Sequence, residues 1–191
     1  MSTTTDAFTF WPATPGRWDD VEGLFRDASY PQRCWCAYWY LPNKEFKAGW
    51  GEGNRATLKA KVASERPPGL LAYDGEVPIG WCAMAPREEH DRLNRSKPFA
   101  PIDDCSVWSL TCFVVRKGYR RKGLMRALIA AAVDHALRQG VSTLEAYPVE
   151  VCGKSGKSEL YFGSLGAFLD NGFVEVKRRL PARPIVRLAL R

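Results

Sequence analysis

The stretch VVRKGYRRKGLMRALI, residues 114–129, decides how this chain folds. It begins at the end of an apolar run, passes through a short glycine-containing loop and continues as a helical pattern. Residues 116–126 contain six Arg or Lys among eleven positions. Free N–H groups at a helix start, the positive end of the helix dipole and cationic side chains together form an anion site. The stretch therefore predicts a strand–loop–helix unit that suits a pyrophosphate.

Two other interpretations of this basic stretch stay open from the residues alone. It could be a surface turn that binds nothing, or part of a nucleic-acid surface, which the net charge of +7 also favours. The basic residues gather at one helix start instead of along a face, and no zinc-finger, helix-turn-helix or RRM signature accompanies them. We therefore expect no nucleic-acid partner. The motifs G-x-x-x-x-G-K-[ST] and G-x-G-x-x-G are also absent, which argues against nucleotide hydrolysis and Rossmann dinucleotide binding.

Length and composition are those of one ordinary globular domain. The chain has 191 residues, of which 46% are hydrophobic and 26% charged, enough for one full core and short for two. We expect a single domain over residues 1–191. The first residues, MSTTTDAFTFW, do not resemble a secretory signal, and no apolar run approaches the roughly 18 residues of a membrane span. The expectation is a cytoplasmic protein without a membrane partner.

The six cysteines are expected to be reduced thiols, because disulfides rarely persist in the cytoplasm. Cys34 and Cys36 could supply half of a zinc site, but no second close Cys or His pair follows, and His90 and His135 stand apart. We expect no metal. A free cysteine behaves as a small hydrophobic residue, so buried and inert thiols are the economical interpretation.

Periodicity predicts the elements before the basic loop. It predicts a short strand over residues 8–11 and a helix over residues 15–28. It also predicts a second helix, ended by Pro42, that carries an aromatic stripe of Trp35, Tyr38 and Trp39. Asn54 is the expected N-cap of a helix through Ser64. Two apolar runs, 69–73 and 78–85, flank Asp74-Gly75 and predict a hairpin.

The remaining elements surround that loop. Residues 105–115 are apolar on both faces, which is typical of a central strand, and Leu110 and Cys112 are expected to share one face. A helix over 123–139 ends before Gly140, and a strand over 142–149 follows. Residues 163–179 predict a short helix, a stop at Gly172 and a further strand, and residues 184–191 predict the last strand.

On these features the chain resembles the GNAT superfamily of acyl-CoA-dependent N-acetyltransferases. The family signature [QR]-x-x-G-x-[GA] matches residues 120–125, except that Met125 replaces the last small residue. The order of the elements fits, and GSLGAFLDNGF resembles the family's fourth helix with its Gly-Phe ending. The resemblance implies an α/β (α+β) fold whose mixed, mostly antiparallel central sheet is flanked by helices. Its fourth and fifth strands would splay apart around the cofactor.

The resemblance also implies a site for acetyl-CoA. Backbone N–H groups of residues 121–126 would hold the pyrophosphate, Val115 would bond the pantetheine arm, and the Phe113 N–H would face the thioester carbonyl as oxyanion donor. The implied cofactor residues are Phe113, Val114, Val115, Arg120, Arg121, Lys122, Gly123, Leu124, Met125 and Arg126.

Two catalytic positions depart from the family pattern. The usual basic glutamate on the fourth strand corresponds to Ser109, so Glu145 on the fifth strand is the preferred base. Loop carboxylates compete with it: Glu88, Glu89, Asp103, Asp104 and Glu150. The usual acidic tyrosine corresponds to Phe168. Tyr161 is the preferred substitute, with Tyr147 or solvent as alternatives.

In this family the segment containing Trp35, Tyr38 and Trp39 lines the acceptor side of the cleft. These rings could bind an amine by cation–π contact, or they could simply pack in the core. The prediction is acetyl transfer to the amine of a small molecule by direct attack in a ternary complex. A protein or peptide acceptor, a non-catalytic acyl-CoA sensor and a nucleic-acid-associated protein are the alternatives, and pairing into a homodimer stays open.

Overall fold

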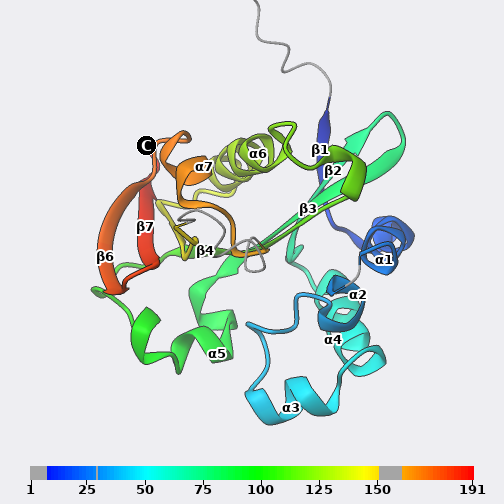
Figure 1. The fold of residues 1–191 in the computed structure, drawn as a ribbon, viewed down its shortest axis with the longest axis horizontal. Helices are drawn as coiled ribbons and strands as arrows, with labels where there is room; N and C mark the ends of the chain where they lie inside the picture. Colours follow the sequence, from blue (N-terminus) through cyan, green and yellow to red (C-terminus); the bar gives the residue numbers. More distant parts are fainter. Residues whose placement is uncertain (1–7, 29, 151–160) are drawn as a thin grey trace, which may run out of the picture.

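A computed structural model describes residues 8–28, 30–150 and 161–191 and shows one mixed sheet. Its seven strands lie in the order β1-β2-β3-β4-β5-β7-β6 (Figure 1). All neighbouring strands are antiparallel except β4 and β5, which are parallel. The bounds are β1 Thr9–Pro12, β2 Gly69–Asp74, β3 Val77–Pro86, β4 Trp108–Val115, β5 Thr143–Ala146, β6 Val174–Leu180 and β7 Arg183–Ala189. The predicted mixed, mostly antiparallel sheet is confirmed.

Helices cover both faces of this sheet. In Figure 1, α6 and α7 lie on one side of the strands, and α1 to α5 lie toward the other side. The bounds are α1 Trp18–Arg26, α2 Pro31–Cys34, α3 Asn43–Ala48, α4 Glu52–Val62, α5 Asp91–Asn94, α6 Leu124–Arg138 and α7 Leu165–Leu169. The predicted hairpin, the long helix before Gly140 and the stop at Gly172 are confirmed, and both glycines have positive φ.

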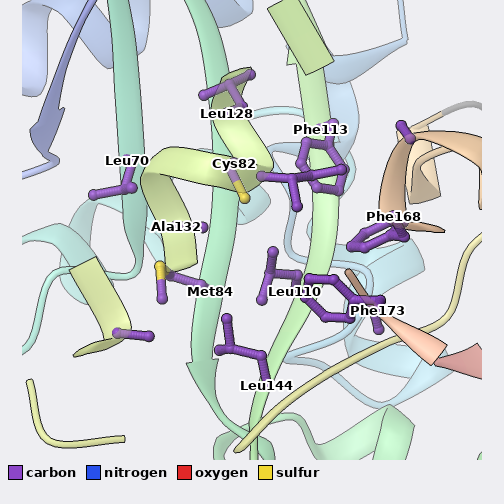
Figure 2. Packing of buried hydrophobic residues seen from close by; sticks show 14 of the residues in the cluster. Leu70, Cys82, Met84, Leu110, Phe113, Leu128, Ala132, Leu144, Phe168 and Phe173 are labelled. Carbon is purple, nitrogen blue, oxygen red and sulfur yellow. The ribbon is translucent and has the colours of Figure 1, made fainter. Parts of the chain in front are cut away.

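Each face has its own hydrophobic core. The α6-side core packs α6 and α7 against the sheet, and Figure 2 shows part of it: Leu70, Cys82, Met84, Leu110, Phe113, Leu128, Leu144, Phe168 and Phe173. The α1-side core buries the amphipathic face of α1 with residues from α4 and the strands, including Val21, Leu24, Phe25, Leu58, Leu71, Trp81 and Val114. β4 contributes to both cores, as expected of a central strand.

A β-bulge in β4 changes which face its residues occupy. Met84 pairs with Leu110 and Ala83 with Cys112, so Thr111 is the extra residue. Leu110 therefore packs in the α6-side core, whereas Cys112 packs in the α1-side core. The prediction that both share one face was wrong, because strict alternation has no place for an inserted residue.

β4 and β5 separate after a short paired stretch. Only three register pairs join them, from Trp108–Leu144 to Leu110–Ala146. β4 continues to Val115, whereas β5 ends at Ala146. Residues 111–115 of β4 thus have no β5 partner. The predicted splay is confirmed.

Two helix predictions were wrong in their details. The aromatic segment is not one helix, because α2 ends at Cys34 and both Trp35 and Cys36 have left-handed φ angles of 49° and 50°. Turns continue from there to Tyr40. Asn54 is not an N-cap but a buried residue inside α4, whose Nδ2 donates to the carbonyls of Arg33 and Phe46 at 3.2 and 3.3 Å. Its polar side chain serves tertiary packing.

Candidate functional site

The unpaired part of β4 presents backbone groups to the gap beside β5. The Arg116 N–H donates to the carbonyl of Ile79, a residue of β3, at 2.9 Å. Successive N–H groups of a strand point to opposite edges, so those of Phe113 and Val115 point away from β3. They face the edge that β5 leaves unpaired. The family resemblance implies a backbone contact for each of them: Val115 with the pantetheine arm and Phe113 with the thioester carbonyl.

The basic loop follows directly. The Arg120 Nε donates to the Val115 carbonyl at 3.1 Å, which folds the loop back onto the end of β4. Arg121 and Gly123 have positive φ angles of 63° and 80°, and Gly123 is the N-cap of the 15-residue helix α6. An added Cβ at Gly123 would meet nothing within 4 Å. The left-handed backbone, not crowding, therefore favours glycine there.

Side chains of the loop diverge from its backbone. Arg120, Arg121, Lys122 and Arg126 are exposed, Leu124 is buried in the α6-side core, and Met125 packs partly against it. Arg126 forms an ion pair with Asp170, 2.5 Å between Nε and Oδ2. The first N–H groups of α6 lack intrahelical partners by position, and they lie among cationic side chains. Both features fit a pyrophosphate group.

An aromatic cavity of about 540 Å³ lies beside β4. It is lined by Tyr30, Pro31, Cys34, Cys36, Tyr38, Trp39, Cys112, Tyr161, Phe162 and Arg183. The Trp39 Nε1–H donates to the carbonyl of the bulge residue Thr111 at 3.0 Å, which fixes one wall to β4. Cys112, the next lining residue, directly precedes Phe113. The cavity therefore reaches the strand that carries the unpaired N–H groups.

The three predicted acceptor residues separate in the structure. Tyr38 and Trp39 line the cavity, whereas Trp35 is 1% exposed and belongs to the α1-side core. Its ring stacks on Phe25, with centroids 5.3 Å apart and planes 7° apart, and lies 6.2 Å from the Trp18 ring. The left-handed turn after α2 directs Trp35 inward. For Trp35, the packing interpretation fits its surroundings.

Tyr161 lies on the cavity wall. Its half-buried ring stacks on Tyr30 with centroids 5.9 Å apart. Phe162 packs edge-on against Trp39 at 5.6 Å. Phe168, at the position of the usual family tyrosine, is fully buried and contacts Phe113 edge-to-face at 5.8 Å. Phe168 thus belongs to the core, and Tyr161 is the predicted acid that reaches the cavity.

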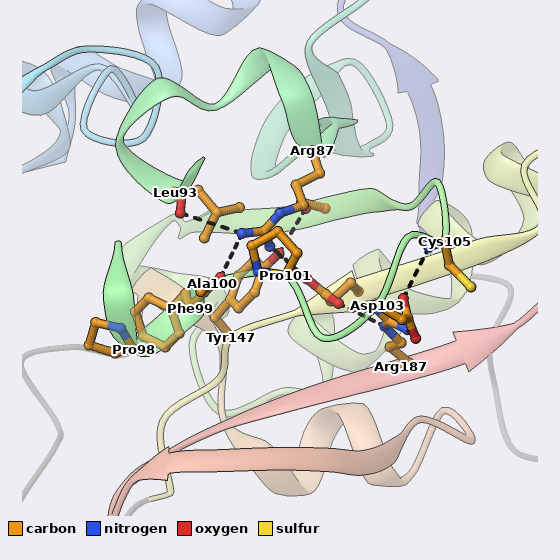
Figure 3. Close-up of polar contacts among 12 residues, drawn as sticks. Arg87, Leu93, Pro98, Phe99, Ala100, Pro101, Asp103, Cys105, Tyr147 and Arg187 are labelled. Atoms are coloured by element: carbon orange, nitrogen blue, oxygen red, sulfur yellow. Dashed lines mark hydrogen bonds and ion pairs between the residues drawn. The ribbon is translucent and has the colours of Figure 1, made fainter. Parts of the chain in front are cut away.

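Glu145 lies in a buried ion-pair network and is not among the residues that line the cavity. Figure 3 shows the network residues Arg87, Tyr147 and Arg187. It is 1% exposed; its Oε1 lies 2.8 Å from Nη1 of Arg87 and its Oε2 lies 2.7 Å from Nε of Arg187. The Tyr147 hydroxyl donates to the same carboxylate and lies 3.0 Å from the Ser109 Oγ. Burial, with the neighbouring carboxylate, raises the pKa of Tyr147 well above its usual value.

The competing loop carboxylates also lie outside the set of cavity-lining residues. Asp103 pairs with Arg187 at 2.6 Å, Glu89 pairs with Lys61 and Arg66, and Glu150 pairs with Arg178. Glu88 and Asp104 are exposed. Of the general acids and bases predicted from the sequence, Tyr161 is therefore the one that lines the cavity in the described part of the chain.

Several lining residues were not predicted. Tyr30, Phe162 and Arg183 come from segments far apart in sequence, and none belongs to a motif. The Arg183 Nη2 donates to the Tyr147 carbonyl at 3.1 Å, and its guanidinium lies 4.3 Å from the Phe162 ring centroid. Tyr30 lies near Trp35 in the sequence and Phe162 directly follows Tyr161, and this proximity to predicted site residues was the only sequence signal for them. Arg183 had no such signal.

Residues 8–28, 30–150 and 161–191 show neither a metal-binding cluster nor a membrane-spanning helix. Within these ranges, no group of three or more His, Cys, Asp or Glu side chains is arranged to hold a metal ion. Nor do they contain a helix long and apolar enough to span a bilayer.

Comparisons with known proteins agree with this geometry. Residues 24–154 match the acetyltransferase (GNAT) family. The fold is similar to that of the PaiA N-acetyltransferase from Thermoplasma acidophilum in complex with coenzyme A, at 11% identity and TM-score 0.54 over 100% of both chains. It is similar to YncA from Salmonella typhimurium with its cofactor acetyl-CoA, at 15% identity and TM-score 0.54 over 97% of this chain and 95% of that one.

A third similar structure is a chain of the NatC complex bound to Gag peptide and CoA, at 14% identity and TM-score 0.52 over 96% of this chain and 99% of that one. No curated protein matches the chain by sequence. The family match covers more than half of the chain and agrees with the splayed β4 and β5 and the basic loop before α6. The chain therefore belongs to the GNAT family of acetyltransferases, which are acyl-CoA-dependent transferases.

Proposed function

We propose that this acetyltransferase transfers the acetyl group of acetyl-CoA to the amine of a small molecule bound in the aromatic cavity. One observation carries the proposal: Cys112 lines the cavity, and the next residue, Phe113, directs its N–H into the gap between β4 and β5. A donor in the gap and an acceptor in the cavity would meet at this point of β4. Direct attack within a ternary complex needs such a meeting point.

The donor side fits acetyl-CoA through backbone groups. The N–H groups of residues 121–126 would hold the pyrophosphate at the start of α6, with exposed Arg120, Arg121 and Lys122 adding positive charge. Val115 would form a backbone hydrogen bond with the pantetheine arm. The neighbouring Val114 would help to hold this part of β4 in position. Because the contacts are backbone contacts, Met125 in place of a small residue is compatible with the site.

Phe113 and Tyr161 have distinct roles in this proposal. The Phe113 N–H would stabilise the negative charge that develops on the thioester carbonyl oxygen, and a preorganised donor needs no rearrangement to do so. Tyr161 would donate a proton to the departing thiolate from the cavity wall.

Glu145 as the general base stays a prediction that its surroundings do not favour. Two arginines and Tyr147 occupy its oxygens, and it does not line the cavity. A positioning role is the better fit, because the network fixes β5 beside the gap. Water inside the cavity would then act as the base and take the proton of the amine.

The cavity favours a compact acceptor. Its volume is within the range of small-ligand sites, and Tyr38 and Trp39 offer ring faces or edges to an amine-bearing group. The NatC complex, which has a similar fold, is bound to a peptide, so a peptide amine is the second candidate. A sensor that binds acetyl-CoA without turnover is the third.

The test is thermal unfolding of the full chain with acetyl-CoA, CoA and acetyl-pantetheine, which lacks the pyrophosphate. Acetyl-CoA at 100 times its Kd should add about 2.7 kcal/mol of stability, and acetyl-pantetheine much less. Thiol release with a panel of small amines and of peptides then assigns the acceptor class. Stabilisation without thiol release would support the sensor, and no stabilisation at millimolar acetyl-CoA would contradict the proposed donor site.

A further inference from the structure

Two thiols in the cavity wall lie in direct contact. The Sγ atoms of Cys36 and Cys112 are 2.7 Å apart, although the residues are 76 positions apart in sequence. A disulfide S–S bond is about 2.05 Å long, so only a small movement separates these sulfurs from bonding distance. Cys36 is 3% exposed and Cys112 is 8% exposed, and both line the cavity. A small reagent that enters the cavity would therefore reach both sulfurs.

The backbone around each thiol holds it in place. Cys36 follows Trp35, whose ring is stacked on Phe25, and both residues adopt left-handed φ angles that non-glycine residues rarely use. Cys112 follows the bulge residue Thr111, whose carbonyl accepts the Trp39 indole hydrogen bond. The contact is thus produced by two rigid segments, a strained turn and a bulged strand.

We propose that Cys36 and Cys112 form an oxidisable dithiol that peroxides convert to an intramolecular disulfide. One sulfur attacks a peroxide oxygen, the O–O bond breaks, and a sulfenic acid and one water form when the peroxide is hydrogen peroxide. The second sulfur attacks the sulfenic sulfur and releases another water. Overall, the two thiols lose two protons and two electrons, and hydrogen peroxide is reduced to two waters.

The surroundings of the pair shape its reactivity. Burial raises the pKa of Cys36 well above its usual value, and the thiolate is the reactive form, so the first step is slow at neutral pH. The second step needs no diffusion, because the partner sulfur is already in contact. Cys34 lines the same cavity and Cys105 is exposed, so these two cysteines are the relevant competitors in the described part of the chain.

The test is oxidation of the full chain with hydrogen peroxide, alkylation of the remaining thiols and non-reducing peptide mapping. Trypsin cleavage leaves Cys34 with Cys36 in one peptide and Cys105 with Cys112 in another. The double variant Cys34→Ser/Cys105→Ser removes this ambiguity. It should give a crosslink between residues 36 and 112, with an intact mass lower by two hydrogens and full reversal by dithiothreitol.

Matched variants complete the experiment. Cys36→Ser and Cys112→Ser should each lose the crosslink, with thermal unfolding used to confirm that they are folded. Three outcomes would overturn the proposal: both thiols alkylated after oxidation, both sulfurs overoxidised without a crosslink, or a crosslink that persists in either single variant. The wild-type map decides the question even if a variant does not fold. None of these measurements depends on acetyl transfer, so the proposal stands or falls separately from the proposed function.

Discussion

The carboxylate of Glu145 lies 2.8 Å from the guanidinium of Arg87, and both side chains are buried. Arg87 also donates to the carbonyls of Leu93 and Phe99, at 3.4 and 2.5 Å (Figure 3). One charged pair therefore joins β5 to the segment after β3. Because β5 borders the proposed donor gap, this pair sets the position of the gap without facing the cavity.

Glu145→Gln should lower the free energy of unfolding by about 3–5 kcal/mol, because it leaves the Arg87 charge buried without its partner. Urea unfolding of wild type and variant measures this. Asp103→Asn is the matched control: it removes an exposed, solvent-screened partner of Arg187 and should destabilise the fold far less. A variant of unchanged stability whose kcat falls and loses its pH dependence would instead make Glu145 the general base.

Gly163→Ala should destabilise the fold and lower activity. An added Cβ would lie 2.6 Å from the Phe168 ring and 3.2 Å from the Phe113 ring, and the φ angle of 83° disfavours any side chain. Overpacking and left-handed strain together should cost about 2–4 kcal/mol in urea unfolding. Gly166→Ala in α7, whose Cβ would meet nothing within 4 Å, should be neutral or slightly stabilising. Equal effects of the two substitutions would contradict this account.

Tyr161→Phe should lower kcat by about 10²-fold or more while leaving the affinity for acetyl-CoA unchanged, because it removes the proposed proton donor and keeps the ring. Steady-state thiol release and donor-dependent thermal unfolding separate the two effects. Tyr30→Phe keeps the other ring of the stacked pair and should retain nearly full kcat. If Tyr161→Phe also retains full kcat, the thiolate takes its proton from another source.

The strand–loop–helix unit of the proposed donor side was predictable because its residues are adjacent in sequence. Residues 114–129 place strand end, basic loop and helix start next to one another, so spacing predicts free helix N–H groups among cationic side chains. Their use as a pyrophosphate site stays a prediction. The separation of β4 from β5 followed from the family resemblance, and three register pairs confirm it.

The aromatic cavity, the proposed acceptor side, was less predictable because it depends on tertiary contacts. The spacing of Trp35, Tyr38 and Trp39 satisfies the helical rule, yet packing directs Trp35 to Phe25 and Trp39 to the Thr111 carbonyl. One continuous helix could not make both contacts. The left-handed residues Trp35 and Cys36 therefore interrupt the helical path. The bulge at Thr111 likewise left no sign in the alternation of β4, although it brings Cys112 to the cavity.

His90 should make the fold sensitive to mild acid. Its side chain is fully buried, its ring stacks on Tyr40 at 4.9 Å, and its Nε2 lies 3.4 Å from the Thr111 hydroxyl. Burial lowers the pKa of His90 from 6.5 to about 4. Between these pH values the unfolded chain binds a proton that the folded chain does not. Stability is therefore complete above pH 6.5 and is lost as the pH falls toward 4.

The expected loss is on the order of 3 kcal/mol across this range, measured by urea unfolding at successive pH values. His90→Gln should remove most of the slope. Burial also lowers the pKa of His135, but that ring is less enclosed, so His135→Gln should flatten the profile less. The carboxylate of Glu22, whose pKa falls to about 2 beside Arg55 and Arg26, adds acid sensitivity only below pH 4.5. Equal slopes above pH 4.5 in wild type and His90→Gln would show that His90 is not the group responsible.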